Sequence, residues 1–134
     1  MATTKNKPAK TSTKATGVYT NDAVFPDRVM LDIPIDFASG PKAPHFRKVK
    51  ALALRISADL EELALGTNES FPISAHVDDF RDANGTWWTG IRIVIELCQD
   101  GMEAVTERKA AITICNQVMI RTWLVNAIAA LRGA

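Results

Sequence analysis

Two alternating segments joined by a turn signal constrain the fold of this chain more than any other feature. Residues 71–78 and 87–97 alternate, with apolar side chains at the odd-numbered positions of the first segment and at Ile91, Ile93, Ile95 and Leu97 of the second, which is the period of a half-buried strand. Between them lies Asn84-Gly85, the strongest short-range signal for a β-hairpin. The sequence therefore predicts an antiparallel pair of strands whose odd-numbered side chains face a core.

A third alternating segment precedes this pair. From Val29 to Phe37 every odd-numbered residue is apolar, and Asp32 and Asp36 are among the even-numbered ones. The pattern predicts another half-buried strand. Pro34 has no N–H to donate to a neighbouring strand, so we expect this strand at a sheet edge or interrupted by a bulge.

The first predicted helix covers residues 44–65, where apolar residues recur at intervals of three and four. Pro44 suits a first helical turn, and Gly66 suits the position that follows a helix. A breaker-rich segment at 38–44 separates this helix from the strand before it. The segment therefore predicts one amphipathic helix between the first strand and the hairpin.

The second predicted helix runs from about Gly101 to Leu131. Asp100 and Glu103 have the spacing of a capping box, and no turn signal follows before the end of the segment. Residues 110–115 also alternate, so a fourth strand there is the alternative. The cap and the absence of a turn favour the helix.

The order β-α-β-β-α predicts an α+β fold, a two-layer domain with a small, mostly antiparallel sheet and both helices on one face. We assign residues 29–134 to this single domain and residues 17–28 to a linker. Residues 1–16 form a Lys/Thr-rich basic arm that lacks apolar side chains larger than alanine except Met1, so we expect it to be disordered. It holds Lys5, Lys7, Lys10 and Lys14 and no acid; without these four lysines the chain has 12 bases against 15 acids.

Composition excludes several classes of protein. A chain of 134 residues that is 47% hydrophobic can bury a core and is too apolar to be disordered throughout. Its two cysteines, Cys98 and Cys115, are isolated, which favours buried thiols in a reducing compartment over a metal or disulfide framework. We expect a cytoplasmic location and no cofactor. We also expect no membrane association, because residues 118–131 are too few to span a membrane and contain Arg121 and Asn126.

The sequence contains no catalytic motif with a known mechanism, such as GxSxG, a Walker loop or HExxH. We therefore expect a protein that is not an enzyme. A further alternative is a metal-dependent nuclease on the even-numbered sheet face, because carboxylates can hold a divalent ion. That face carries Asp32, Asp36, His76, Asp78, Arg92 and Glu96, and it is equally consistent with a solvated surface.

The predicted first helix has its charges reversed relative to the helix dipole. Arg47, Lys48 and Lys50 lie in its first turns, whereas acids fill its last turns. Cations around the unsatisfied N–H groups of a helix start would attract an anion, and phosphate is the obvious one. The plain alternative is that these bases are solvated on an exposed face.

Trp87 and Trp88 follow the predicted hairpin turn, and consecutive strand residues face opposite ways. By parity Trp87 should enter the core and Trp88 should face outward, near Arg81 and Arg92. An outward tryptophan beside arginines can stack on a base or anchor a protein partner. The alternative is a tryptophan that covers a sheet edge.

The C-terminal segment predicts self-association. From residue 110 to 131, 16 of 22 residues are apolar, and the polar ones are distributed around the helix. A helix that is apolar on nearly all sides must be buried on nearly all sides, and a small sheet covers only one. We assign Met119, Trp123 and Ile128 to a homo-oligomer interface.

Together these features predict a non-catalytic accessory protein that binds nucleic acid electrostatically, DNA rather than RNA, with little sequence preference and some preference for single strands. The contacts would come from Lys5, Lys7, Lys10, Lys14, Arg47, Lys48, Lys50, Trp88 and Arg92. The alternative is an oligomeric protein-interaction or virion module. The small size and the basic arm are typical of accessory proteins of phages or plasmids, which would act in the host cytoplasm.

Overall fold

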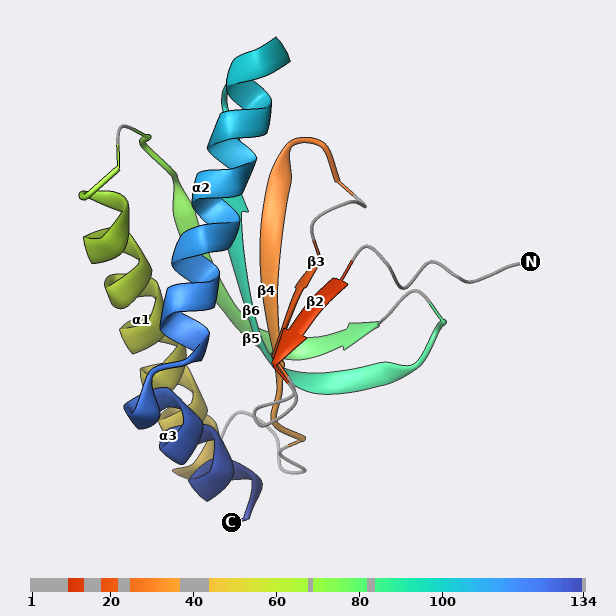
Figure 1. The fold of residues 1–134 in the computed structure, drawn as a ribbon. Coiled ribbons are helices and arrows are strands. Elements are labelled where there is room, and N and C mark those ends of the chain that lie inside the picture. The colour runs from red at the N-terminus through yellow and green to blue at the C-terminus, as the bar shows by residue number, and fades with distance from the viewer. Residues whose placement is uncertain are drawn as a thin grey trace.

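A computed structural model describes residues 10–13, 18–21, 25–36, 44–67, 69–81 and 84–133. They form two layers, a sheet with helices on one of its faces (Figure 1). The strands are β2 (Lys10–Thr13), β3 (Val18–Asn21), β4 (Arg28–Pro34), β5 (Ile73–Arg81) and β6 (Trp87–Glu96), and the helices are α1 (Pro44–Ala64), α2 (Gly101–Met119) and α3 (Thr122–Arg132). The α+β class and the predicted order of elements from residue 28 onward are confirmed.

The sheet has two strands that the sequence did not reveal. Its order is β2-β3-β4-β6-β5, and all neighbours are antiparallel. Strand β2 lies within the segment that we assigned to the basic arm, and β3 lies within the segment that we assigned to the linker. Pairing of β3 with β4, and of β2 with β3, supplies the backbone hydrogen bonds that order these short segments. Lys5, Lys7 and Lys14 lie outside the described residues.

The core lies between the sheet and the helices, as the alternation predicts. The odd-numbered residues Val29, Leu31 and Ile33 of β4 and Ile91, Ile93 and Ile95 of β6 are all 0% exposed. Helix α1 packs on β5 and β6, whereas α2 packs on β3 and β4. Pro34 lies beyond the residues of β4 that pair with β3, so its missing N–H costs this strand pair nothing.

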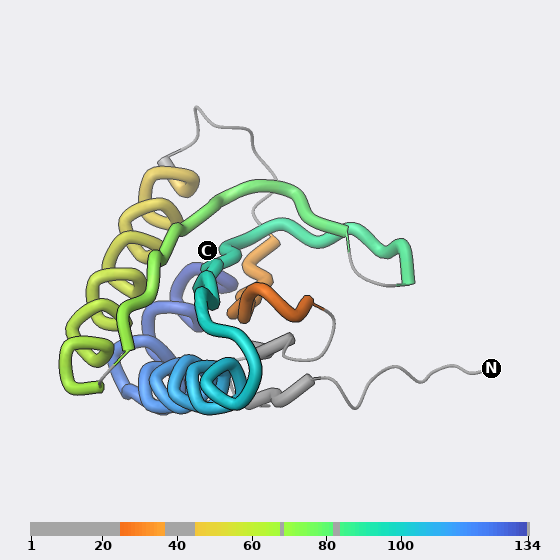
Figure 2. The backbone as a smooth tube through the Cα atoms, turned by 90° about the horizontal axis from the view of Figure 1, so that it is seen from above, coloured from red at the N-terminus to blue at the C-terminus, as the bar shows by residue number. Residues whose placement is uncertain are grey.

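The β5–β6 hairpin extends past the helical layer and projects away from it (Figure 2). Burial therefore ends within β6. Ile91 is 0% exposed, whereas Trp87, which is closer to the turn, is 64% exposed. The expectation that Trp87 enters the core is wrong, since no helix reaches the outer part of the hairpin to cover it.

The long C-terminal helix is broken. Residues 110–115 are helical, as favoured, but the expected single helix bends by 67° between α2 and α3. Arg121 at the break is held by Asp59 of α1, with Nη1 3.0 Å from Oδ2, and Arg132 at the end of α3 donates from Nε to the Pro34 carbonyl oxygen at 2.8 Å. In the described part of the chain no single helix is long and apolar enough to cross a membrane. The bent α2–α3 pair has the necessary length and apolar composition only when its two helices are taken together.

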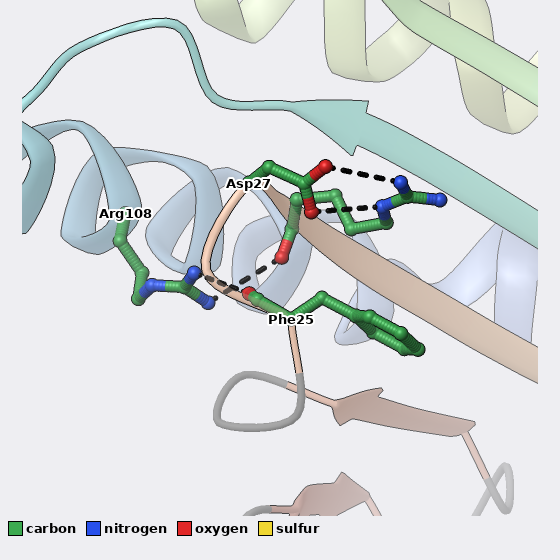
Figure 3. Close-up of polar contacts among 4 residues, drawn as sticks. Phe25, Asp27 and Arg108 are labelled. Atoms are coloured by element: carbon green, nitrogen blue, oxygen red, sulfur yellow. Dashed lines mark hydrogen bonds and ion pairs between the residues drawn. The ribbon is translucent and has the colours of Figure 1, made fainter.

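A polar anchor from α2 holds the turn at the start of β4. The guanidinium of Arg108 donates to the carbonyl oxygens of Phe25 (2.6 Å) and Arg28 (3.4 Å), so α2 fixes the turn that enters β4 (Figure 3). Beside it, the side-chain hydrogen bond from Arg28 lowers the pKa of Asp27. Helix α2 begins at Gly101 as predicted, but the side chain of Asp100 makes no capping bond.

The two cysteines differ in exposure. Cys115 is buried in the core as expected, and its burial raises the pKa of the thiol to about 12. Cys98 is exposed, so the expectation of two buried thiols holds only for Cys115.

Candidate nucleic-acid interface

The helix-free face of the sheet holds a compact group of aromatic and charged side chains, which we call the aromatic face: Asp32, Phe80, Trp88 and Arg92. Arg92 binds Asp32 through two hydrogen bonds, Nε to Oδ1 at 2.8 Å and Nη2 to Oδ2 at 3.1 Å. Its guanidinium carbon lies 4.7 Å from the centroid of the Phe80 ring and 5.5 Å from that of Trp88. The two ring centroids are 4.8 Å apart.

Strand register brings these four residues together. Asp32 on β4 is directly opposite Arg92 on β6, and Phe80 on β5 is directly opposite Trp88 on β6. All four positions are even-numbered, so their side chains point away from the helices. The predicted proximity of Trp88 and Arg92 is thus observed, whereas Phe80 was missed, although its parity and its place beside the turn could have revealed it.

Arg92 is committed to contacts within the face. The ion pair with Asp32 is largely shielded, with side-chain exposures of 22% for Arg92 and 13% for Asp32. A guanidinium in a two-bond pair with a carboxylate has few donors left for a phosphate. Arg92 therefore positions the rings of Phe80 and Trp88 by cation–π contact and contributes little free positive charge.

The tip of the hairpin carries the most accessible tryptophan. Trp87 is 64% exposed, and the guanidinium carbon of Arg81 lies 5.6 Å from the centroid of its ring. Arg81 is itself oriented by a bond from Nε to the carbonyl oxygen of Gly85 at 3.1 Å. A signal for this exposure was present in the sequence, because the odd-numbered positions between Trp87 and the core, Asp79 and Thr89, are polar and mark the end of the core-facing pattern.

The acidic residues of this face do not gather into the cluster that the nuclease alternative would need. Within the described ranges no group of three or more His, Cys, Asp or Glu residues could hold a metal ion. Asp32 is bound to Arg92, and His76 is hydrogen-bonded to Ser74 at 3.0 Å. The nuclease alternative would need the carboxylate of Asp32 to be available to a metal ion, whereas this carboxylate is paired with Arg92.

The predicted basic residues lie elsewhere. Arg47, Lys48 and Lys50 are exposed on α1, which covers the opposite face of the sheet from Trp88 and Arg92. The backbone of Lys10 begins β2, at the other edge of the sheet from β5. The structure therefore does not unite the helix-start bases and the tryptophan into one phosphate-binding surface.

The residues assigned to an oligomer interface also need correction. Met119 and Ile128 are each 1% exposed within a single chain, because the bend between α2 and α3 folds both helices onto the core. Trp123 is partly buried, and the guanidinium carbon of Arg55 lies 3.8 Å from the centroid of its ring. Met119 and Ile128 are thus not accessible to a second chain.

The candidate interface thus consists of the exposed Trp87–Arg81 pair at the hairpin tip and the partly exposed Trp88 and Phe80 rings on the aromatic face. Both derive from one projecting hairpin, and both offer ring faces with a neighbouring arginine. Comparison with other proteins adds nothing to this description, since no family model, no curated protein and no solved structure matches the chain.

Proposed function

We propose that this protein binds single-stranded nucleic acid, DNA rather than RNA, through the β5–β6 hairpin, with little sequence preference and without catalysis. The observation that supports this proposal most strongly is Trp87, 64% exposed beside Arg81 on a hairpin that projects clear of the helices. Every base offers a face on which an aromatic ring can stack, so such a contact tolerates any sequence. A base stacked on Trp87 would replace water on an apolar ring that the fold leaves uncovered.

Stacking must supply most of the free energy of this contact. Asp78 and Asp79 are exposed on the same hairpin as Arg81, so the local charge is not strongly positive. Each stacked base contributes about 1–3 kcal/mol, which is sufficient for weak binding to a short strand. Attraction of the phosphates would come from the lysines of the N-terminal segment, in which β2 begins at Lys10.

Trp87→Ala is expected to weaken binding of a labelled oligothymidylate about tenfold, which corresponds to about 1.4 kcal/mol of stacking free energy. Fluorescence anisotropy at low salt measures this change, and an RNA oligonucleotide and a DNA duplex of matched length test the preference for single-stranded DNA. The matched control is Ile120→Ala, because Ile120 is 74% exposed between α2 and α3, away from the hairpin. Equal affinities of the wild-type protein and Trp87→Ala would exclude the hairpin tip as the binding site.

Deletion of residues 1–9 is expected to reduce the salt dependence of binding. It removes Lys5 and Lys7 but leaves β2 intact, which a deletion through residue 16 would not. Each phosphate of a single strand that a lysine no longer neutralises reduces the magnitude of the slope of log K against log salt by about 0.7. Loss of both lysines should therefore reduce this magnitude by up to about 1.4. An unchanged slope in anisotropy titrations at several salt concentrations would remove both lysines from the mechanism.

We place this function in the cytoplasm. Both Cys98 and Cys115 are free thiols, and Cys98 is exposed. An exposed free thiol persists most readily in a reducing compartment, which supports this location.

A further inference from the structure

The outward face of α1 carries an apolar stripe that the fold does not cover. Ala51, Leu54 and Ala58 of α1 are exposed, as is Leu65 directly after it, whose N–H still donates to the Glu61 carbonyl oxygen at 3.2 Å; the exposed fractions are 60% for Leu54 and 85% for Leu65. The inward face of the same helix, which includes Ile56 and Leu60, is fully buried against the sheet. Single exposed leucines are ordinary, but four apolar residues aligned on one helix face form a surface suited to another helix.

The spacing of the stripe is that of a coiled-coil seam. The full series is Arg47, Ala51, Leu54, Ala58, Glu61 and Leu65, and its steps alternate between four and three residues. Arg47 and Glu61 are its two polar positions. This alternation keeps the series on one side of the helix over five turns, a length of about 27 Å. The two alanines near its middle leave room for a second helix to approach closely.

The charges on either side of the stripe are separated along the helix. Arg47, Lys48 and Lys50 are exposed near its start, and Glu61 and Glu62 are exposed near its end. Within the described part of the chain, none of these five residues forms an ion pair. The bases at the start of α1 and the acids at its end both interact unfavourably with the helix dipole. The first turn contains no acid and the last turn contains no base that would offset this interaction. No ion pair within the described chain compensates for this unfavourable arrangement.

We infer that α1 is a homodimer interface, in which α1 packs antiparallel on α1 of a second copy. An antiparallel pair places the basic start of each helix against the acidic end of the other, so opposite charges meet at both ends. A parallel pair would place like charges together at both ends. Charge complementarity therefore selects both the occupant of the stripe, a copy of this chain, and its direction.

The symmetry of the pair follows from the stripe. A two-fold axis at its middle places Leu54 of each copy against Ala58 of the other, a large residue against a small one. At the ends, the aliphatic part of Arg47 lies against Leu65 of the second copy, and Lys48 and Lys50 lie near its Glu62 and Glu61. The interface lies on the helical layer, so the hairpin of both copies stays accessible, and this inference does not depend on the proposed nucleic-acid binding.

Leu54→Glu tests the apolar part of the interface. Sedimentation velocity over a range of concentrations is expected to show a dimer for the wild-type protein and at least a tenfold weaker dimer for the variant, because each interface would bury two unpaired carboxylates. The circular dichroism spectrum should be unchanged, since Leu54 is exposed in the single chain, whereas the melting temperature should fall only by the amount that loss of the dimer removes, and this difference should shrink as the protein is diluted. The matched control is Met102→Glu on α2, where the side chain is 79% exposed and the dimer should persist.

Exchange of charges tests the direction of the pair. Lys48→Glu with Lys50→Glu makes both helix ends acidic, and Glu61→Lys with Glu62→Lys makes both ends basic. Each double variant alone should self-associate at least tenfold more weakly than the wild-type protein, and an equimolar mixture of the two should form a heterodimer. A monomeric wild-type protein, a dimer insensitive to Leu54→Glu, or two variants that do not combine would overturn the inference.

Discussion

Gly90→Ala is expected to lower the free energy of unfolding by about 3 kcal/mol. A Cβ atom at position 90 would lie 2.2 Å from the carbonyl oxygen of Ile33 and 2.8 Å from the backbone nitrogen of Ile35. Both neighbours belong to the backbone and cannot rotate away. The N–H groups of Ile35 and Asp36 also share the carbonyl oxygen of Thr89, at 2.8 and 2.7 Å, so separation of the strands would lengthen these bonds.

Urea unfolding followed by tryptophan fluorescence measures this destabilisation. The matched control is Gly66→Ala, because the only atom near a Cβ there is the Leu63 carbonyl oxygen at 3.4 Å, an ordinary contact. The control should change stability by less than about 1 kcal/mol. If both variants unfold at the wild-type urea concentration, β4 and β6 are not in the close contact described at Gly90.

Glu107→Ala is expected to lower the free energy of unfolding by about 3 kcal/mol. Glu107 is 1% exposed, and its carboxylate accepts hydrogen bonds from the backbone N–H of Cys98 at 2.8 and 2.9 Å and of Gln99 at 2.8 Å. Alanine would leave these donors without the carboxylate and would open a cavity beside the core. The loop between β6 and α2 would lose the side chain that holds it to the helix.

Glu103→Ala is the matched control for this variant, since Glu103 is an exposed acid one turn earlier on α2. Its removal eliminates only a favourable interaction with the helix dipole, about 0.5 kcal/mol. Thermal melts of both variants, followed by circular dichroism, separate the two roles. A larger destabilisation by Glu103→Ala than by Glu107→Ala would show that the capping-box pattern, and not the buried carboxylate, holds the start of α2.

The sequence predicts elements whose signals are local. Alternation around Asn84-Gly85 located the hairpin, and the strand at β4 and the helix at α1 followed from their periods. The strands β2 and β3 could not be found in this way, because such four-residue segments become ordered only by pairing within the sheet. The break at Arg121 has no glycine or proline to mark it, and the ion pair that Arg121 forms there joins it to Asp59, which is distant in sequence.

The candidate site was predictable only in part, for the same reason. Parity placed Trp88 and Arg92 on one face, but it could not show that Arg92 is bound to Asp32 or that the helices end before Trp87. Glu107 looked like any polar residue on a helix surface, since its partners are backbone N–H groups of the preceding loop. These features depend on how elements meet in space, which a residue pattern does not encode.

The bond between Arg132 and Pro34 bears on how the chain acquires its structure during synthesis. It joins residues 98 positions apart, and the bond from Arg108 to the Arg28 carbonyl oxygen spans 80. Both ends of β4 are thus secured by residues that the ribosome adds much later. Because such long loops must close before these contacts can form, β4 completes its contacts only after Arg132 has been synthesised, and chain topology limits the pace of this step more than helix formation does.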